Sequence, residues 1–106
     1  MNRPRHRYLL VKLLGNDMIS AQGVKEAVEA SVEQMFGKFG SAEMKVRLIA
    51  LDSARRMAVL RCELKSVEKL RCAVALISQV NRQMAMAAVI RSSGTIKGLG
   101  VRIPRR

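Results

Sequence analysis

The sequence predicts a single two-layer α+β domain. Four stretches place apolar residues at every second position, as strands do, and two place them three and four residues apart, as helices do. Their order along the chain is strand, helix, strand, strand, helix, strand. Right-handed crossovers turn this βαββαβ order into a four-stranded antiparallel sheet with two helices on one face, which is the ferredoxin-like or RRM-like sandwich. We expect the other face of the sheet to stay open.

The first strand is expected over about residues 8–14. It follows a flexible basic arm over residues 1–6, which contains the only histidine of the chain. Leu9, Val11 and Leu13 alternate along the strand and should face the core.

The first helix has a clear start. Ser20 suits its N-cap position, since a serine hydroxyl can accept a hydrogen bond from an unpaired backbone N–H of the first turn. The helix is expected to run to about Phe36. Gly37 then stands where helices often end in a left-handed residue, and we expect residues 36–40 to form a flexible loop.

The second and third strands are expected over about residues 44–51 and 57–64, and the short connection between them suggests a hairpin. In the second strand, Val46, Leu48 and Ala50 should face the core.

The last third of the chain adds one helix and one strand. Ser66 can cap the second helix, which should stop near Asn81. The fourth strand is expected over about residues 86–93, and residues 98–106 should form a basic C-terminal tail. One domain therefore accounts for residues 1–106.

The chain carries a large excess of positive charge. Its 20 Lys and Arg against 8 Asp and Glu give a formal net charge of +12 and a pI near 11.1. A polyanionic partner is the natural inference, and nucleic acid is favoured over an anionic membrane because the apolar runs have the length of strands. No convincing secretory signal is present, so we expect a cytoplasmic protein.

The sequence offers no assembled catalytic or metal site. Cys62 and Cys72 lack the further cysteines or histidines that a zinc site needs. We expect both to be buried free thiols, and the alternative is a disulfide. The acidic residues fall on a helix face, in a turn and near a strand end instead of converging. We therefore expect no metal, no bound cofactor and no catalytic residue in this chain.

Basic residues recur on the sheet face that we expect to be open, a face that should also include Val89. Lys and Arg side chains there can meet phosphates, and the hydroxyls and glycine after the fourth strand would let a phosphate approach the backbone, with Gly94 at a left-handed φ. The alternative is a solvated strand end followed by an ordinary Ser/Gly turn. The candidate RNA-binding residues are Lys12, Lys45, Arg47, Arg61, Arg91, Ser93, Gly94, Thr95 and Lys97.

RNA-recognition modules of this topology stack single-stranded bases on aromatic side chains of the two central strands. The strands here offer only one aromatic residue, so we expect RNA contacts to follow backbone and shape. A protein partner should use large exposed side chains, although the two phenylalanines could equally close the end of the core. The candidate partner-interface residues are Tyr8, Leu10, Phe36 and Phe39.

Four short motifs, in this order, resemble those of one family. They are Arg7-Tyr8-Leu9-Leu10, similar to its opening strand; Phe36-Gly37-Lys38-Phe39-Gly40, similar to its helix exit; Ala58-Val59-Leu60-Arg61-Cys62, similar to its central strand; and Ser93-Gly94-Thr95-Ile96-Lys97, similar to its Ser-Gly-Thr-Ile-Lys signature. The family is archaeal ribonuclease P protein component 2, the counterpart of a small eukaryotic ribonuclease P/MRP subunit.

The resemblance implies a non-catalytic subunit of the ribonucleoprotein that removes the 5′ leader from precursor tRNA, in which the RNA component performs the magnesium-dependent cleavage. It also implies three partners: ribonuclease P RNA, precursor tRNA through the holoenzyme, and ribonuclease P protein component 3, in a heterotetramer around a component 2 dimer. Two alternatives stay open, namely another basic RNA-binding scaffold such as a ribosomal protein, and a ferredoxin-like module for a small ligand.

Overall fold

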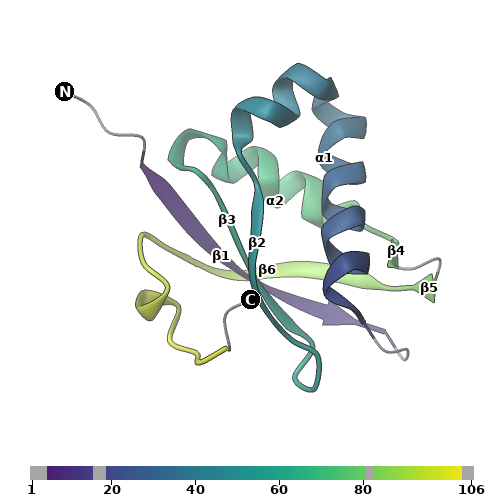
Figure 1. The fold of residues 1–106 in the computed structure, drawn as a ribbon, viewed down its shortest axis with the longest axis vertical. Helices are drawn as coiled ribbons and strands as arrows, with labels where there is room; N and C mark the ends of the chain where they lie inside the picture. The colour runs from purple at the N-terminus through teal and green to yellow at the C-terminus, as the bar shows by residue number, and fades with distance from the viewer. Residues whose placement is uncertain (1–4, 16–18, 81–82, 104–106) are drawn as a thin grey trace.

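The computed structural model describes residues 5–15, 19–80 and 83–103. An antiparallel sheet has the strand order β2-β3-β1-β6, and two helices cover one of its faces (Figure 1). This arrangement confirms the predicted ferredoxin-like sandwich. The elements are β1 (His6–Leu14), α1 (Ala21–Met44), β2 (Arg47–Asp52), β3 (Met57–Glu63), η1 (Leu64–Ser66), α2 (Val67–Ala75), β4 (Gln79–Val80), β5 (Gln83–Met84), β6 (Met86–Ser93) and η2 (Lys97–Leu99).

The main core lies between the sheet and the helices. Leu9, Val11 and Leu13 of β1 alternate into it as predicted, and none is more than 2% exposed. Leu60 of β3 and Leu70 of α2 are equally buried in the same cluster. Because these side chains recur at strand and helix spacings, the helix-covered face of the sheet follows from the sequence pattern.

α1 begins where the sequence predicts but ends later. Ser20 is its N-cap, and the Ser20 Oγ accepts a hydrogen bond from the Gly23 backbone N–H at 3.0 Å. Gly37 has φ 73° and ψ 177°, so it interrupts the helix where the sequence predicts, but a second helical segment follows it directly. The predicted loop over residues 36–40 is therefore wrong. The helix continues to Met44, whose buried side chain anchors the second segment in the main core.

Two β-bulges change which residues face the core. The pairing of β2 with β3 shifts between Leu48 and Ala50, and Ala50 lies in a cluster on the opposite face. Its predicted core position is wrong because a bulge adds one residue and reverses the alternation beyond it. A similar shift between the β6 partners of Leu10 and Val11 places Val89 against the main core, although we expected it on the other face.

α2 is shorter than predicted. Ser66 occupies its N-cap position without a side-chain capping bond, and the helix ends at Ala75. The predicted stop at Asn81 lies outside the described residues and is too late. A small hairpin that the sequence pattern did not predict, β4 with β5, leads into β6, and β6 has the predicted bounds.

The N-terminal arm is partly ordered into the domain. Residues 1–4 lie outside the described part of the chain, but β1 begins at His6. The Arg5 backbone carbonyl accepts a hydrogen bond from the Leu64 backbone N–H at 2.7 Å. Residues 5 and 6, which we assigned to the arm, therefore belong to the folded domain, where residue 6 begins β1.

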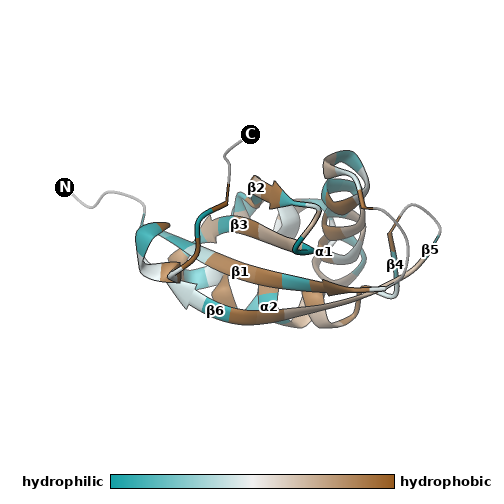
Figure 2. Ribbon diagram, turned by 90° about the horizontal axis from the view of Figure 1, so that it is seen from below, coloured by the Kyte–Doolittle hydropathy of each residue, from teal (hydrophilic) through white to brown (hydrophobic). Residues whose placement is uncertain are grey.

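The outer face of the sheet, which lies away from the helices, is not fully open. The chain after β6 crosses the strands on this face (Figure 2), and we call residues 97–103 the strap. Leu99 is fully buried in a second cluster with Leu10, Ala50 and Val59. The segment that we expected to be a basic tail thus covers part of the face, because its aliphatic side chains leave water there.

Candidate nucleic-acid interface

Three rows of side chains cross the outer face, since directly paired residues on neighbouring antiparallel strands point to the same side. We call them the basic row, near the start of β1, then the middle row, and the turn row beside the β2–β3 connection. In the strand order β2, β3, β1 and β6, the basic row is Arg47, Arg61, Tyr8 and Ser93, the middle row Ala50, Val59, Leu10 and Arg91, and the turn row Asp52, Met57, Lys12 and Ala88.

The strap covers the middle row. Leu10 and Val59 are no more than 2% exposed, and they share a cluster with Leu99 of the strap. Arg91 Nη1 donates a hydrogen bond to the Leu99 backbone carbonyl at 2.9 Å. The guanidinium of this predicted RNA-binding residue therefore fastens the strap to β6.

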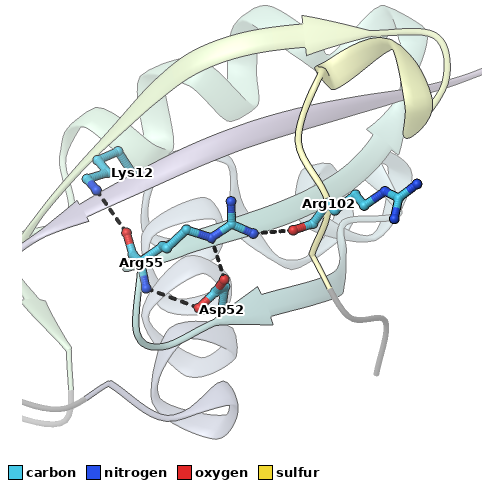
Figure 3. Close-up of polar contacts among 4 residues, drawn as sticks. All are labelled: Lys12, Asp52, Arg55 and Arg102. Carbon is cyan, nitrogen blue, oxygen red and sulfur yellow. Dashed lines mark hydrogen bonds and ion pairs between the residues drawn. The ribbon is translucent and has the colours of Figure 1, made fainter.

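In the turn row, cations also bond to backbone oxygens. Lys12 Nζ donates to the Arg55 carbonyl at 2.8 Å, and Arg55 Nη2 donates to the carbonyl of Arg102 in the strap (Figure 3). Asp52 orients Arg55, because its Oδ2 accepts from Arg55 Nε at 2.6 Å and its Oδ1 accepts from the Arg55 backbone N–H at 3.0 Å. These bonds hold the pKa of Asp52 below its ordinary value. Lys12, another predicted RNA-binding residue, is thus engaged within the fold.

Beyond the strap, Tyr8, Arg47 and Arg61 line one part of a groove of about 1250 Å³, which continues past the edge strand β2 to α1, where Lys25 and Glu29 line it. That volume exceeds an ordinary small-molecule pocket of about 300–1,000 Å³ and suits an extended ligand. Arg61 Nε is buried without an acceptor among the described residues, and Nδ1 of His6, which also lines the groove, is buried without a partner there. A buried donor left unpaired costs about 1–3 kcal/mol. Nε itself is closed to an outside ligand, but Arg61 is half-buried and lines the groove, so its other guanidinium N–H groups are the ones that a phosphate could contact.

Lys45 stands at the end of α1 and also lines this groove. Its Nζ lies 3.5 Å from Glu63 Oε1, and its side chain is 61% exposed. An ion pair between such partners is weak in water. The ammonium of Lys45 can therefore exchange this carboxylate for a phosphate at the groove edge.

The loop after β6 is a turn built on hydroxyl groups. Ser93 Oγ accepts from the Thr95 backbone N–H at 3.3 Å, and Thr95 Oγ1 accepts from the Gly98 backbone N–H at 3.0 Å. Both hydroxyls keep a hydrogen to donate. Gly94 does not have the left-handed φ that we expected. Instead, a Cβ at Gly94 would lie 3.3 Å from Arg7 Nη1, so the glycine gives room to that guanidinium.

Two arginines that we did not predict flank this loop on the helix side. Arg7 lies beside it, and Arg71 Nη2 of α2 donates to Ser92 Oγ at 3.2 Å. The strand alternation carried the signal, since Ser92 must point away from the face that Ser93 occupies. Lys97 is exposed at the start of the strap. The loop therefore has cations on both sides of the sheet.

The four candidate partner residues do not form one surface. Leu10 is 2% exposed, so its assignment as a partner contact does not fit this structure. Phe36 packs on the main core, with Lys69 Nζ 5.6 Å from its ring centroid, as the core-closing alternative requires. Phe39 is 91% exposed on α1 beyond the kink, and Tyr8 lies in the basic row.

Over residues 5–15, 19–80 and 83–103, no three His, Cys, Asp or Glu side chains gather to hold a metal ion, and no helix is long and apolar enough to cross a membrane. Cys62 and Cys72 are free thiols. Burial raises the pKa of Cys62 to about 11. Cys72 is exposed, contrary to our expectation, because it points away from the buried side of α2 that holds Ala73 and Val74.

Comparison with known proteins identifies the family. The profile of the Rpp14/Pop5 family matches residues 7–102. A relative from Thermococcus gammatolerans, named ribonuclease P protein component 2, is 36% identical over 98 residues, which cover 92% of this chain and 81% of the relative. A relative of the same name from Pyrococcus furiosus is 29% identical over 97 residues with the same coverage.

A solved structure shares the fold. A chain in the cryo-EM structure of yeast ribonuclease MRP superposes with a TM-score of 0.68 at 10% identity, covering 90% of this chain and 78% of that chain. The resemblance drawn from the four motifs is confirmed, because the family match spans all of them. The chain belongs to the Rpp14/Pop5 family.

Proposed function

We propose that this chain is a non-catalytic protein subunit of ribonuclease P, which binds the catalytic RNA and supports it in removing the 5′ leader from precursor tRNA. The observation that carries the proposal is the uncovered basic row, where Arg47 and Arg61 line a groove. Membership of a family whose relatives are named ribonuclease P protein component 2 supports the choice of RNA.

The physical benefit to the RNA is charge neutralisation. Closely packed RNA phosphates repel one another, and a protein of net charge +12 replaces part of the counterion atmosphere that would otherwise be needed. The compact RNA should then persist at lower magnesium. In this proposal the RNA binds the magnesium and cleaves the substrate, while the chain binds no cofactor.

We further propose that the chain pairs with ribonuclease P protein component 3, in a heterotetramer around a component 2 dimer, and acts in the cytoplasm. Phe39 supports a protein contact, because a phenylalanine that is 91% exposed loses unfavourable contact with water when a partner covers it. Phe39→Ala should therefore weaken binding to component 3 in calorimetric titration. Met84→Ala is the matched control, since Met84 is 85% exposed at another site and should bind component 3 as the wild type does.

Reconstitution tests the function. Cognate ribonuclease P RNA, component 3 and precursor tRNA are assayed for leader removal over a magnesium series, with and without this chain. We expect the chain to lower the magnesium concentration needed and to show no cleavage on its own. The double variant Arg47→Ala/Arg61→Ala should lose most of the benefit. Lys38→Ala/Lys65→Ala, which removes two exposed charges outside the groove, should retain it. Cleavage without RNA, or no stimulation by the wild type, would contradict the proposal.

A further inference from the structure

We propose that the basic row is a single-nucleotide site, in which one unpaired RNA base stacks on Tyr8 while Arg61 and Arg47 hold the adjoining phosphates. This rests on the proposed function only in taking RNA as the partner. It moves Tyr8 from the set of protein-contact residues to the RNA site, and it adds base stacking to an interface that we expected to contact only backbone.

The pairing of the strands places the necessary chemistry side by side. Tyr8 of β1 lies directly between Arg61 of β3 and Ser93 of β6, and Arg47 pairs with Arg61 from the far side. Neighbouring strands are about 4.8 Å apart, so the aromatic ring and both guanidinium groups lie within the span of one nucleotide and its phosphates. Stacking on an aromatic ring and ion pairing with arginine are the two contacts that single-stranded RNA commonly makes.

The walls of the groove suit a base as well as a phosphate. Tyr8 packs on one side against the cluster beneath the strap and also lines the groove. Ile49 and Ile96 line the same groove among the cations, so an inserted base would meet apolar surface. Arg61 is half-buried and lines the groove, so its guanidinium offers N–H donors to a phosphate oxygen beside that base.

The strap limits the site to one base. Two residues beyond Tyr8 along β1, the next outward side chain is Leu10, which is only 2% exposed. Two residues before Tyr8 is His6, at the start of the strand. The uncovered part of β1 runs from His6 to Tyr8, a length of about 7 Å at a rise of about 3.3 Å per residue. Phe36 and Phe39 lie on α1, so among the described residues the only other ring on this face of β1 is the imidazole of His6, which is half-buried at the end of the strand.

The sequence supplies its own reporter for a test. Tyr8 is the only tyrosine and the chain has no tryptophan, so tyrosine fluorescence of the full chain reports on this position alone. The probes are a uridine hexanucleotide and an abasic ribose-phosphate oligomer of equal length and charge. Both should bind with similar salt dependence. Only the uridine oligomer should quench the fluorescence, and it should bind about 5- to 150-fold more tightly, as expected for one base stack.

Variants separate stacking from charge. Tyr8→Phe keeps the ring and should keep the preference for the uridine oligomer. Tyr8→Leu keeps an apolar side chain and should bind both oligomers equally, with its fold checked by urea denaturation. Arg47→Ala should weaken both oligomers alike and leave their ratio unchanged.

Several outcomes would overturn the site. If the wild type binds both oligomers with equal affinity and its fluorescence is not quenched, the basic row contacts phosphates only and no base stacks on Tyr8. Absence of binding by either oligomer would also overturn it, while the reconstitution assay would still decide the proposed function independently. If component 3, and not RNA, changes the Tyr8 fluorescence, the surface takes a protein and the inference fails.

Discussion

The covered and open parts of the outer face use the same residue types in different ways. Near the strap, Lys12 and Arg91 donate hydrogen bonds to backbone carbonyls of the fold. In the groove beyond it, Arg61 retains a buried nitrogen without an acceptor among the described residues, and Arg47 lies beside it. The first pair completes the structure, whereas we propose that the second pair binds RNA phosphates.

This difference shows that counting cations on a sheet face does not locate a phosphate site. A guanidinium has five N–H donors, and its role depends on which acceptors the fold already supplies. The strap supplies carbonyls to Arg91 and Arg55, so these side chains are partly satisfied before any ligand arrives. Among the described residues, no such carbonyl accepts from Arg61 Nε, although Arg61 lines the groove.

Removing the main contact of the strap should produce the largest effect. Leu99 is fully buried, and Leu99→Ala should lower the free energy of unfolding by about 2–5 kcal/mol in urea denaturation, as Leu→Ala substitutions in cores do. Leu64→Ala is the control, because Leu64 is 36% exposed and should cost far less. Equal losses for both variants would mean that the strap does not pack on the sheet as described.

Two glycines sharpen the same comparison. Gly100 in the strap has φ of 76°, and a Cβ there would come within 2.6 Å of Arg91 Nη1, so Gly100→Ala should cost about 1–2 kcal/mol or more of stability. Gly94 has no left-handed φ, and its Cβ would meet Arg7 Nη1 at 3.3 Å. Gly94→Ala should therefore be milder in the same denaturation experiment. If Gly94→Ala lowers the free energy of unfolding more than Gly100→Ala does, the strained backbone position is Gly94 and not Gly100, contrary to the structure.

Salt-dependent binding compares the cations directly. Arg47→Ala and Arg61→Ala should each reduce the slope of the logarithm of RNA affinity against the logarithm of salt concentration by about 0.7–0.9. Arg91→Ala should leave the slope nearly unchanged and instead lower stability, because its guanidinium holds the Leu99 carbonyl. This replaces our expectation from sequence, in which Arg91 contacted phosphate. If Arg91→Ala reduces the slope while Arg47→Ala and Arg61→Ala leave it unchanged, the expectation that Arg91 contacts phosphate is correct after all.

The sequence predicted the helix-side layer well, because alternation and helical spacing leave few choices there. β6 has the expected bounds, and Leu9, Leu60 and Leu70 meet in the core as expected. Gly37 was correctly assigned a left-handed φ, but whether the chain re-enters a helix depends on Met44 reaching the core. The contact between Met44 and the core is a tertiary contact, so the presence of a glycine at position 37 could not predict it.

The outer face was predicted less well for two physical reasons. Bulges reverse the alternation without any residue type that marks them, which misplaced Ala50 and Val89. The strap was read as a tail because glycines and arginines interrupt it, yet Leu99, Val101 and Ile103 alternate as they would on an apolar surface. That alternation was the available signal. The hydrogen bonds that engage Arg91 and Lys12 follow from the strap and the turn, so sequence alone could not separate these cations from Arg47 and Arg61.

The smallest expected effect concerns the turn row, where Asp52 holds Arg55 toward the strap. Hydrogen bonds from Arg55 depress the folded-state pKa of Asp52 below the ordinary 3.8, so the ionised carboxylate stabilises the fold above that value and the contribution is lost as pH falls through the folded-state pKa. Asp52→Asn should lower the denaturation midpoint slightly at neutral pH, and the difference from wild type should shrink as the pH falls below 3.8 and through the folded-state pKa. Glu68→Gln is the control, since Glu68 is 88% exposed and lies 3.8 Å from Arg71 Nε, away from the strap. If Asp52→Asn has the same effect at every pH, the carboxylate does not hold Arg55 through its charge, and the link between the turn and the strap depends on shape alone.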